Sequence, residues 1–274
     1  MPKIELIQGD CLEKMKDIPD GGIDMVLTSP PYDNLRTYNG SLDWGEHIWK
    51  PVIQELFRII KDGGVVVWVV GDATIKGSET GTSFKQALYF KEIGFNLHDT
   101  MIYAKNSYMP LTHNRYEQAF EYMFILSKGK PKTFNPIKVP SITVGTYRNR
   151  GGSKAKEGSY AERKRDEKTK VSAYKQAPNI FYYDVGKGDK TEHNAPFPEQ
   201  LANDHIISWS NEGDTILDPF AGSGTVGKMA KQLNRNCILI EKDPAYCEIA
   251  EKRINIQTDI GSCVLIVNAS RRNR

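Results

Sequence analysis

The sequence predicts an α/β fold in which helices cover a doubly wound, mostly parallel sheet. Two apolar runs, Ile23–Leu27 and Val65–Val70, are short and rich in branched residues, which is typical of buried parallel strands. Farther along, a strand over 215–217 is followed by a glycine-containing turn, a helical period and a second strand that ends on Glu241. Strand, glycine turn, helix, strand and acid, in this order, form the nucleotide-binding half of a doubly wound fold.

The other elements follow from the same apolar periods. Strands are predicted over 4–7, 97–103, 121–127 and 237–240, and helices over 12–18, 47–60, 84–93, 199–209 and from about 225. Between about 132 and 190 the periodicity is weak. We therefore predict two halves of one sheet, over 1–131 and 191–274, with an insertion between them.

Composition narrows the class of protein. With 274 residues and 39% hydrophobic content the chain can build a large core, which excludes disorder of the whole. No apolar run approaches the ~20 residues of a membrane span, and the N-terminus lacks the features of a signal peptide. Four scattered cysteines without metal spacing favour reduced thiols. The sequence thus predicts a cytoplasmic protein with no membrane contact and no metal site.

A Pro-Pro loop, Thr28-Ser29-Pro30-Pro31-Tyr32, directly follows the first buried strand. Two prolines cannot continue a sheet ladder, so they leave stiff backbone and fixed carbonyl oxygens at the carboxyl end of a strand, where open α/β sheets bind ligands. Ser29 Oγ and the Pro30 carbonyl could accept the two hydrogens of an exocyclic amino group, and Tyr32 could stack on an extruded base. The alternative is a turn that only ends the strand.

Acids and glycines mark the other strand ends. Asp10, just past the first strand, is placed either to accept from an adenine amino group or to cap the following helix. Gly222, Gly224 and Gly227 lie in a glycine loop, Asp218–Gly227, and formally satisfy G-x-G-x-x-G. This pattern predicts an adenosine ligand and leaves a nicotinamide-binding oxidoreductase open as one alternative.

The insertion is locally basic. From Arg148 to Lys175 there are ten Lys or Arg against four acids, with tyrosines interleaved, whereas the whole chain carries only +3. Such a stretch is typical of a surface that contacts phosphates, although a solvated loop is the common alternative. A nucleic-acid-binding module with a vestigial nucleotide fold is therefore a further alternative.

The Pro-Pro loop and the glycine loop together resemble the catalytic and cofactor motifs of DNA methyltransferases that methylate exocyclic amino groups. The catalytic motif comes first and a basic insertion separates the two, as in the circularly permuted beta group of that family. The resemblance implies a class I methyltransferase-like (Rossmann-like) sheet, S-adenosylmethionine as cofactor, double-stranded DNA as partner, base flipping, and a target-recognition region at 132–190. It leaves a homodimer and a companion restriction endonuclease open.

The resemblance also implies residue roles at the cofactor. Asp10 would contact the adenine of S-adenosylmethionine with Cys11 beside it, and Glu241 would bind the ribose. The cofactor loop would consist of Asp218 at its base and of Phe220, Gly222, Ser223, Gly224 and Thr225. His193 and Asn194 open a segment similar to the one that holds the methionine end, where many members have Lys in place of Phe197.

At the target base, the resemblance assigns the catalytic roles to Ser29, Pro30, Pro31 and Tyr32. Many adenine-specific members carry Asp or Asn where Ser29 stands, and Ser is more often associated with methylation of cytosine N4. The sequence therefore favours N4 of cytosine as the acceptor in a restriction-modification or related system, with N6 of adenine as the alternative. Transfer would be direct, without a covalent enzyme intermediate, because none of the cysteines follows a proline.

Overall fold

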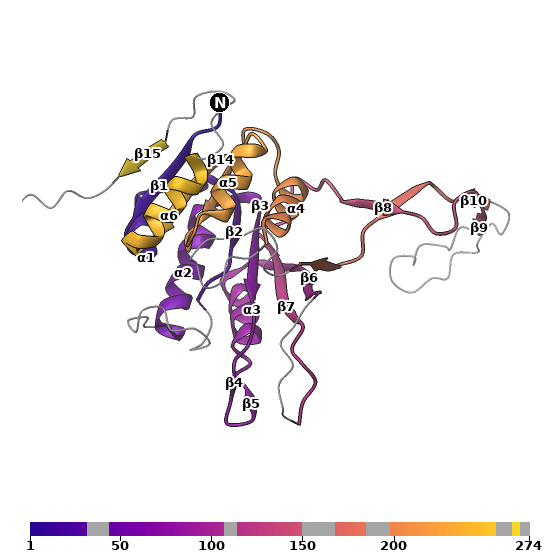
Figure 1. Ribbon diagram of the computed structural model, residues 1–274, viewed down its shortest axis with the longest axis horizontal. Helices are drawn as coiled ribbons and strands as arrows, with labels where there is room; N and C mark the ends of the chain where they lie inside the picture. The colour runs from indigo at the N-terminus through magenta and orange to yellow at the C-terminus, as the bar shows by residue number, and fades with distance from the viewer. Residues whose placement is uncertain (32–43, 107–113, 150–167, 185–197, 256–264, 269–274) are drawn as a thin grey trace, which may run out of the picture. The chain divides into compact units, whose positions relative to one another are not determined.

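The structure, a computed structural model, describes residues 1–31, 44–106, 114–149, 168–184, 198–255 and 265–268 (Figure 1). It forms two compact units, one of residues 1–135 with 179–274 and a smaller one of residues 136–178. The larger unit contains a nine-stranded sheet and the six helices that the structure describes. The smaller unit contains two short antiparallel strand pairs.

The large sheet has the strand order β12-β6-β7-β3-β2-β13-β14-β1-β15. Its strands are β1 (Ile4–Gln8), β2 (Ile23–Thr28), β3 (Ile60–Val70), β6 (Asn96–Lys105), β7 (Phe120–Ser127), β12 (Ile180–Tyr183), β13 (Thr215–Asp218), β14 (Asn236–Glu241) and β15 (Leu265–Asn268). Neighbouring strands are parallel except where β7 pairs with β3 and β6. The mostly parallel sheet predicted from the sequence is confirmed.

Helices cover both faces of the sheet, which explains why its central strands, such as β2 and β3, are continuous apolar runs. Val66, Trp68 and Val70 pack with α1 (Cys11–Met15), α2 (Glu46–Ile59) and α3 (Thr82–Ile93). Val65, Val67 and Val69 point to the other face and pack with α4 (Glu199–Trp209), α5 (Thr225–Gln232) and α6 (Pro244–Asn255). Among the described residues, none of these helices has the length and apolar character needed to cross a membrane.

Two strands of the large sheet were not predicted. The strand β12 falls inside the stretch 132–190 assigned to the insertion, yet it pairs with β6 along Ile180–Tyr183, so these four residues belong to the large sheet. The strand β15 pairs with β1 in the C-terminal stretch. Both are short edge strands, and in β12 only Tyr183 is buried, so the strand does not form a buried apolar run. Such strands leave little periodic signal in a sequence.

The smaller unit is built from short ribbons. Strand β8 (Lys138–Pro140) pairs with β11 (Tyr174–Gln176), and β9 (Tyr147–Asn149) pairs with β10 (Lys168–Lys170). The centre of the basic stretch, 150–167, lies outside the described residues. Its role in target recognition therefore stays a prediction.

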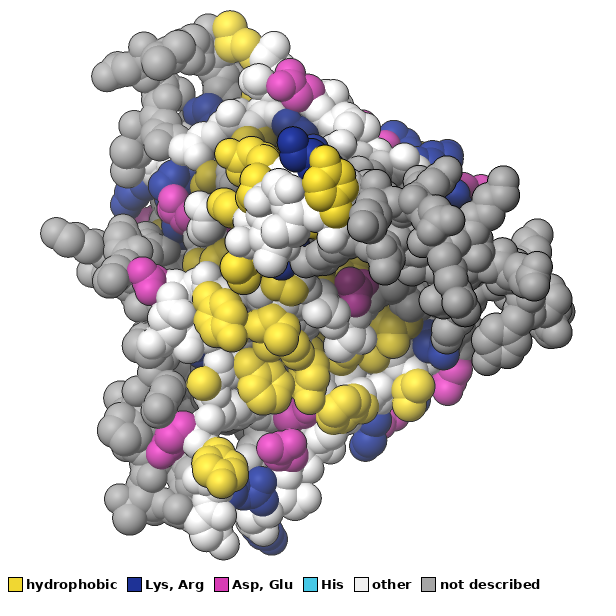
Figure 2. All heavy atoms as spheres, turned by 90° about the vertical axis from the view of Figure 1, so that its right-hand side faces the viewer, with side chains coloured by type: hydrophobic (Ala, Val, Ile, Leu, Met, Phe, Trp, Pro, Cys, Tyr) yellow, Lys and Arg dark blue, Asp and Glu magenta, His cyan; other side chains and the backbone are white. Residues whose placement is uncertain are grey.

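Hydrophobic side chains gather at the surface of the side seen in Figure 2, among charged ones. In the larger unit, the exposed hydrophobic residues include Ile180 and Tyr182 on β12 and Phe84 and Leu88 on α3. The homodimer that the resemblance leaves open stays untested.

Candidate functional site

Four neighbouring strands bring the predicted motifs to one edge of the sheet. The strands β2, β13, β14 and β1 are consecutive and parallel, so their carboxyl ends meet at the same edge. The Pro-Pro loop follows β2, the glycine loop begins at the end of β13, Glu241 ends β14, and Asp10 follows β1. This is the edge at which open α/β sheets bind ligands. The structure therefore brings together the described members of both predicted motifs.

The Pro-Pro loop is anchored at its first residue. Thr28 is buried, and its Oγ1 donates a hydrogen bond of 2.7 Å to Asp218 Oδ1 at the start of the glycine loop. Ser29 and Pro31 are half-buried and Pro30 is buried, while Tyr32 lies outside the described residues. The loop that carries the predicted catalytic residues is thus tied directly to the predicted cofactor loop.

Asp218 braces both loops from a buried position. Besides the bond from Thr28, its Oδ1 accepts from the backbone N–H of Phe220 at 3.1 Å. Burial raises the pKa of Asp218 from 3.8 to about 7, and the nearby charge of Glu241 acts in the same direction. Its carboxyl group therefore holds the backbone at the start of the glycine loop, and its predicted place in a cofactor site stays a prediction.

Asp218→Asn should remove part of the pH dependence of stability. The unfolded chain releases this proton near pH 4 and the folded chain near pH 7, so between these values the folded state binds more protons. The free energy of unfolding of the wild type should then fall as pH rises through this window, by up to ~1.4 kcal/mol per pH unit. Asparagine can still accept from Thr28 but does not titrate, so thermal unfolding should depend less on pH between 4 and 7.

Asp62→Asn is a matched control for this substitution. The Asp62 side chain is 86% exposed, so its removal should leave the slope of stability against pH close to that of the wild type. A wild-type slope in Asp218→Asn would contradict the raised pKa.

The glycines of the loop serve backbone geometry and packing. Gly222 has φ 50° and donates its N–H to Glu241 Oε2 at 2.8 Å. At Gly224, with φ 78°, a Cβ would lie 2.9 Å from the Ala250 Cβ of α6, and at Gly227 it would lie 2.4 Å from Leu239 Cδ1 of β14. Gly224 and Gly227 thus allow α5 to pack closely against α6 and β14. The sequence pattern had instead been interpreted as a loop that binds an adenosine ligand.

The hydroxyl groups of the glycine loop are already bonded to protein. Arg253 Nη1, on α6, donates to Ser223 Oγ at 2.7 Å and to Thr225 Oγ1 at 3.0 Å, and Nη2 pairs with Glu199 Oε1 at 2.7 Å. Ser223 and Thr225 are 2% and 4% exposed. These two predicted residues are thus held in place by Arg253 and lie largely inside the protein. The sequence analysis missed Arg253, since an arginine near the end of a helix has no local signature.

Two carboxylates frame the other side of the loop. Glu241 is half-buried, and its Oε1 accepts from the backbone N–H of Asp243 at 2.8 Å, while its Oε2 accepts from the backbone N–H of Gly222. Asp10 caps α1 by accepting from the backbone N–H of Leu12 at 2.9 Å, which confirms the capping alternative. A carboxylate offers about four acceptor positions. Both acids therefore have capacity left for donors of a ligand, such as hydroxyl or amino groups.

Cys11 does not face an open site. Its thiol is 8% exposed and packs in the cluster with α1 and α2, and burial raises its pKa to about 12, with the charge of Asp10 adding to the effect. Like Cys237 and Cys247, it is a free thiol. If Cys11 lies beside the cofactor as predicted, its backbone and not its thiol would make the contact.

Phe220 provides an aromatic contact at the glycine loop. Its ring is half-buried and packs edge-on against Trp44 at 5.6 Å and against Trp68 at 6.5 Å between centroids. Trp44 Nε1 is buried and has no hydrogen-bond partner among the described residues. The predicted residues His193 and Asn194 lie outside the described residues.

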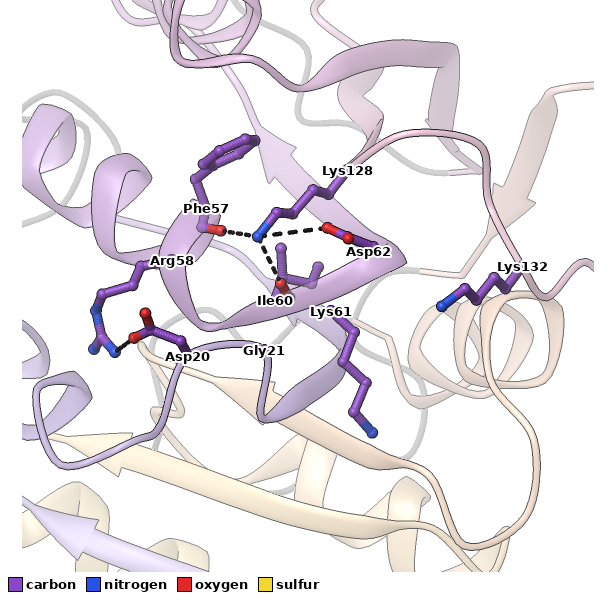
Figure 3. Close-up of a pocket in the computed structure, with 9 residues that line it drawn as sticks. All are labelled: Asp20, Gly21, Phe57, Arg58, Ile60, Lys61, Asp62, Lys128 and Lys132. Atoms are coloured by element: carbon purple, nitrogen blue, oxygen red, sulfur yellow. Dashed lines mark hydrogen bonds and ion pairs between the residues drawn. The ribbon is translucent and has the colours of Figure 1, made fainter.

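A separate pocket of about 600 Å³ lies at the opposite, amino-terminal edge of the strands (Figure 3). Its cations are engaged in structural contacts: Lys128 Nζ donates to the carbonyls of Phe57 and Ile60 at 2.9 and 3.2 Å, and Arg58 pairs with Asp20 at 2.6 Å. Cations at the end of α2 stabilise its free carbonyl groups and its dipole. The contacts of Lys128 and Arg58 at this pocket are therefore explained by capping of the helix end. The pocket lies away from the predicted motifs.

Comparison with known proteins decides the family. The family model described as DNA methylase matches residues 23–252, which include both loops. The chain belongs to the DNA methylase family. The methylase is 51% identical over 256 residues, 87% of this chain and 91% of the relative, to the orphan methyltransferase M.BamHII of Bacillus amyloliquefaciens. These matches decide against the oxidoreductase and the noncatalytic module.

Solved structures agree on the fold of the methylase. The PvuII DNA methyltransferase (cytosine-N4-specific) matches with a TM-score of 0.70 at 20% identity, over 95% of this chain and 89% of that one. TTHA0409, a putative DNA modification methylase from Thermus thermophilus in complex with S-adenosyl-L-methionine, matches with a TM-score of 0.64 at 24% identity, over 97% and 99%. The methylase has the class I methyltransferase fold, and its cofactor is S-adenosylmethionine. The circular permutation stays a prediction from the resemblance.

Proposed function

We propose that the methylase transfers a methyl group to N4 of cytosine within a specific sequence of double-stranded DNA. The observation that carries the proposal is Ser29, an uncharged hydroxyl beside the Pro30 carbonyl, at the end of the strand that neighbours the cofactor loop. The structural neighbour described as cytosine-N4-specific supports the same choice. Methylation of adenine N6 is the alternative.

At the cofactor, we assign the roles by the contacts each residue can still make. Glu241 binds the ribose hydroxyls, because its carboxylate already lies against the N–H of Gly222 in the glycine loop. Asp10 accepts from the adenine amino group, and Phe220 lies under the cofactor. His193 and Asn194, outside the described residues, hold the methionine end. S-adenosylmethionine supplies an electrophilic methyl group on its sulfonium.

At the target base, catalysis consists of orientation. The lone pair of an exocyclic amino nitrogen is delocalised into the ring, so the nitrogen is a weak nucleophile. Ser29 Oγ and the Pro30 carbonyl accept its two hydrogens and turn the lone pair toward the methyl group, while Tyr32 stacks on the extruded base. A serine hydroxyl is too weak a base to remove a proton beforehand, so the proton leaves during or after transfer.

Recognition of sequence is assigned to the insertion at 132–190, whose basic stretch suits DNA phosphates. A homodimer, a companion restriction endonuclease and a cytoplasmic location stay predictions.

The acceptor atom can be identified directly. Unmodified duplex DNA is incubated with the methylase and S-adenosylmethionine that carries an isotopically labelled methyl group, digested to nucleosides and analysed by mass spectrometry. We expect labelled N4-methylcytosine. Labelled N6-methyladenine would assign the alternative, and 5-methylcytosine would overturn the mechanism, because carbon methylation needs a covalent nucleophile. DNA incubated without enzyme is the control.

A further inference from the structure

A small hairpin follows β3, the strand next to β2, which carries the Pro-Pro loop. After β3, the chain forms β4 (Thr74–Ile75) and β5 (Ser78–Glu79), which pair antiparallel around Lys76 and Gly77. The strand β3 neighbours β2 in parallel, so the hairpin leaves the sheet at the same edge as the Pro-Pro loop; Figure 1 shows it beyond the end of β3. Five residues of extended chain from Val70 to Ile75 span ~16 Å.

The base of the hairpin is fixed by a buried acid. Asp72, 3% exposed, accepts from the backbone N–H of Ser83 at 2.9 Å, from Ser83 Oγ at 2.5 Å and from Thr80 Oγ1 at 3.3 Å. The backbone N–H of Thr80 also donates to the Ala73 carbonyl at 2.9 Å. Both ends of the hairpin are thus tied to the start of α3.

The tip is held as well. Arg115, from the segment that leads into β7, donates through Nη2 to the Gly77 carbonyl, and its Nη1 lies 3.9 Å from Glu79 Oε1. An isolated two-stranded hairpin is only marginally stable. The contacts of Asp72 at the base and of Arg115 at the tip therefore stabilise a hairpin that would not be stable through its own two strands alone.

The side chains that the hairpin presents are unusual for a solvent-exposed turn. Residues 74–79 are all exposed, and Ile75 is 48% exposed, so the hairpin adds little to the core. Lys76 has φ 49°, a conformation in which Asn or Gly is usual. The hairpin thus presents the apolar side chain of Ile75 from β4 and a cation, Lys76, in a backbone conformation that usually carries Asn or Gly.

We propose that the β4–β5 hairpin enters the major groove of the DNA next to the target base, with Ile75 against the base step that the extruded base leaves and Lys76 on a phosphate. This inference rests on the proposed function. The major groove admits a two-stranded ribbon and exposes the exocyclic amino groups of cytosine and adenine. Apolar side chains that wedge between bases stabilise an opened base step.

Ile75→Ala tests the wedge. On a duplex with a paired target base, the variant should lose about tenfold or more in kcat/KM, because less of the opened state is stabilised. On the same duplex with a mismatched target base, which is already partly unstacked, the loss should shrink to within about threefold. Ile75→Val should keep most of the activity. Leu88→Ala, which truncates a 59% exposed leucine of α3, is the matched control.

Lys76→Ala tests the phosphate contact. The slope of log K for DNA binding against log salt should become shallower by about 0.9. Lys91→Ala, at the opposite end of α3, should leave the slope unchanged.

Two results would overturn the hairpin inference: equal losses of activity by Ile75→Ala on paired and mismatched DNA, or wild-type behaviour of both hairpin variants. In either case, methylation of DNA by the wild type would still support the proposed function. Binding of S-adenosylmethionine should stay at wild-type affinity throughout. A wild type that binds S-adenosylmethionine but methylates no DNA would overturn both.

Discussion

Glu241→Ala is expected to weaken the binding of S-adenosylmethionine by ~1–3 kcal/mol, the scale for losing hydrogen bonds to a charged group. In the structure the carboxylate lies at the end of β14 and accepts from Gly222 and Asp243 at 2.8 Å each. The substitution removes the proposed ribose acceptor and also one support of the glycine loop. Isothermal titration calorimetry measures the loss of affinity for S-adenosylmethionine. Thermal unfolding without cofactor measures how much stability the protein loses with the support of the glycine loop.

Two further variants separate these effects. Glu241→Gln keeps the shape and one acceptor oxygen, so we expect an intermediate loss of affinity. Glu248→Ala, which removes an exposed acid from α6, should bind S-adenosylmethionine as the wild type does. Unchanged affinity in a folded Glu241→Ala would remove this residue from the ribose site.

Gly224→Ala should destabilise the protein far more than Gly213→Ala, although both glycines have a positive φ. At Gly213, with φ 84°, a Cβ meets nothing within 4 Å, so only backbone strain of about 1–2 kcal/mol is expected. At Gly224 the new Cβ also lies 2.9 Å from the Ala250 Cβ. Forcing an extra methyl group into a packed core costs a further ~1–3 kcal/mol. Denaturant unfolding compares the two variants.

A double variant isolates the clash. Ala250→Gly removes the Cβ with which the new side chain of Gly224→Ala would clash. By itself this substitution should lower the stability by ~1 kcal/mol, because glycine is unfavourable in a helix. We expect Gly224→Ala with Ala250→Gly to be more stable than the sum of the single effects by ~1 kcal/mol or more. Additive effects would show that the Gly224 position is limited by its backbone conformation alone. The affinity for S-adenosylmethionine should fall with stability, since the clash displaces the glycine loop.

The fold class and the types of residue at the strand ends could be predicted from the sequence alone. Parallel strands that are buried on both faces are continuous apolar runs, so Ile23–Leu27 and Val65–Val70 could be predicted without contacts. Because ligands bind at the carboxyl ends of such strands, the residues directly after them, Ser29 and Asp218 among them, were candidates from local order alone. The motif context predicted an adenosine ligand, the resemblance implied S-adenosylmethionine, and the family match agrees with that family.

The neighbours of these residues became known only from the folded structure. The bond between Thr28 and Asp218 joins residues 190 positions apart, because β2 and β13 are adjacent in the sheet, and strand order depends on packing that periodicity does not encode. The same holds for Arg253, which reaches the glycine loop from α6. The role of Gly224 and Gly227 also depended on what a Cβ would meet. Local pattern thus supplied the chemical groups, and long-range packing fixed their partners, their burial and the pKa of Asp218.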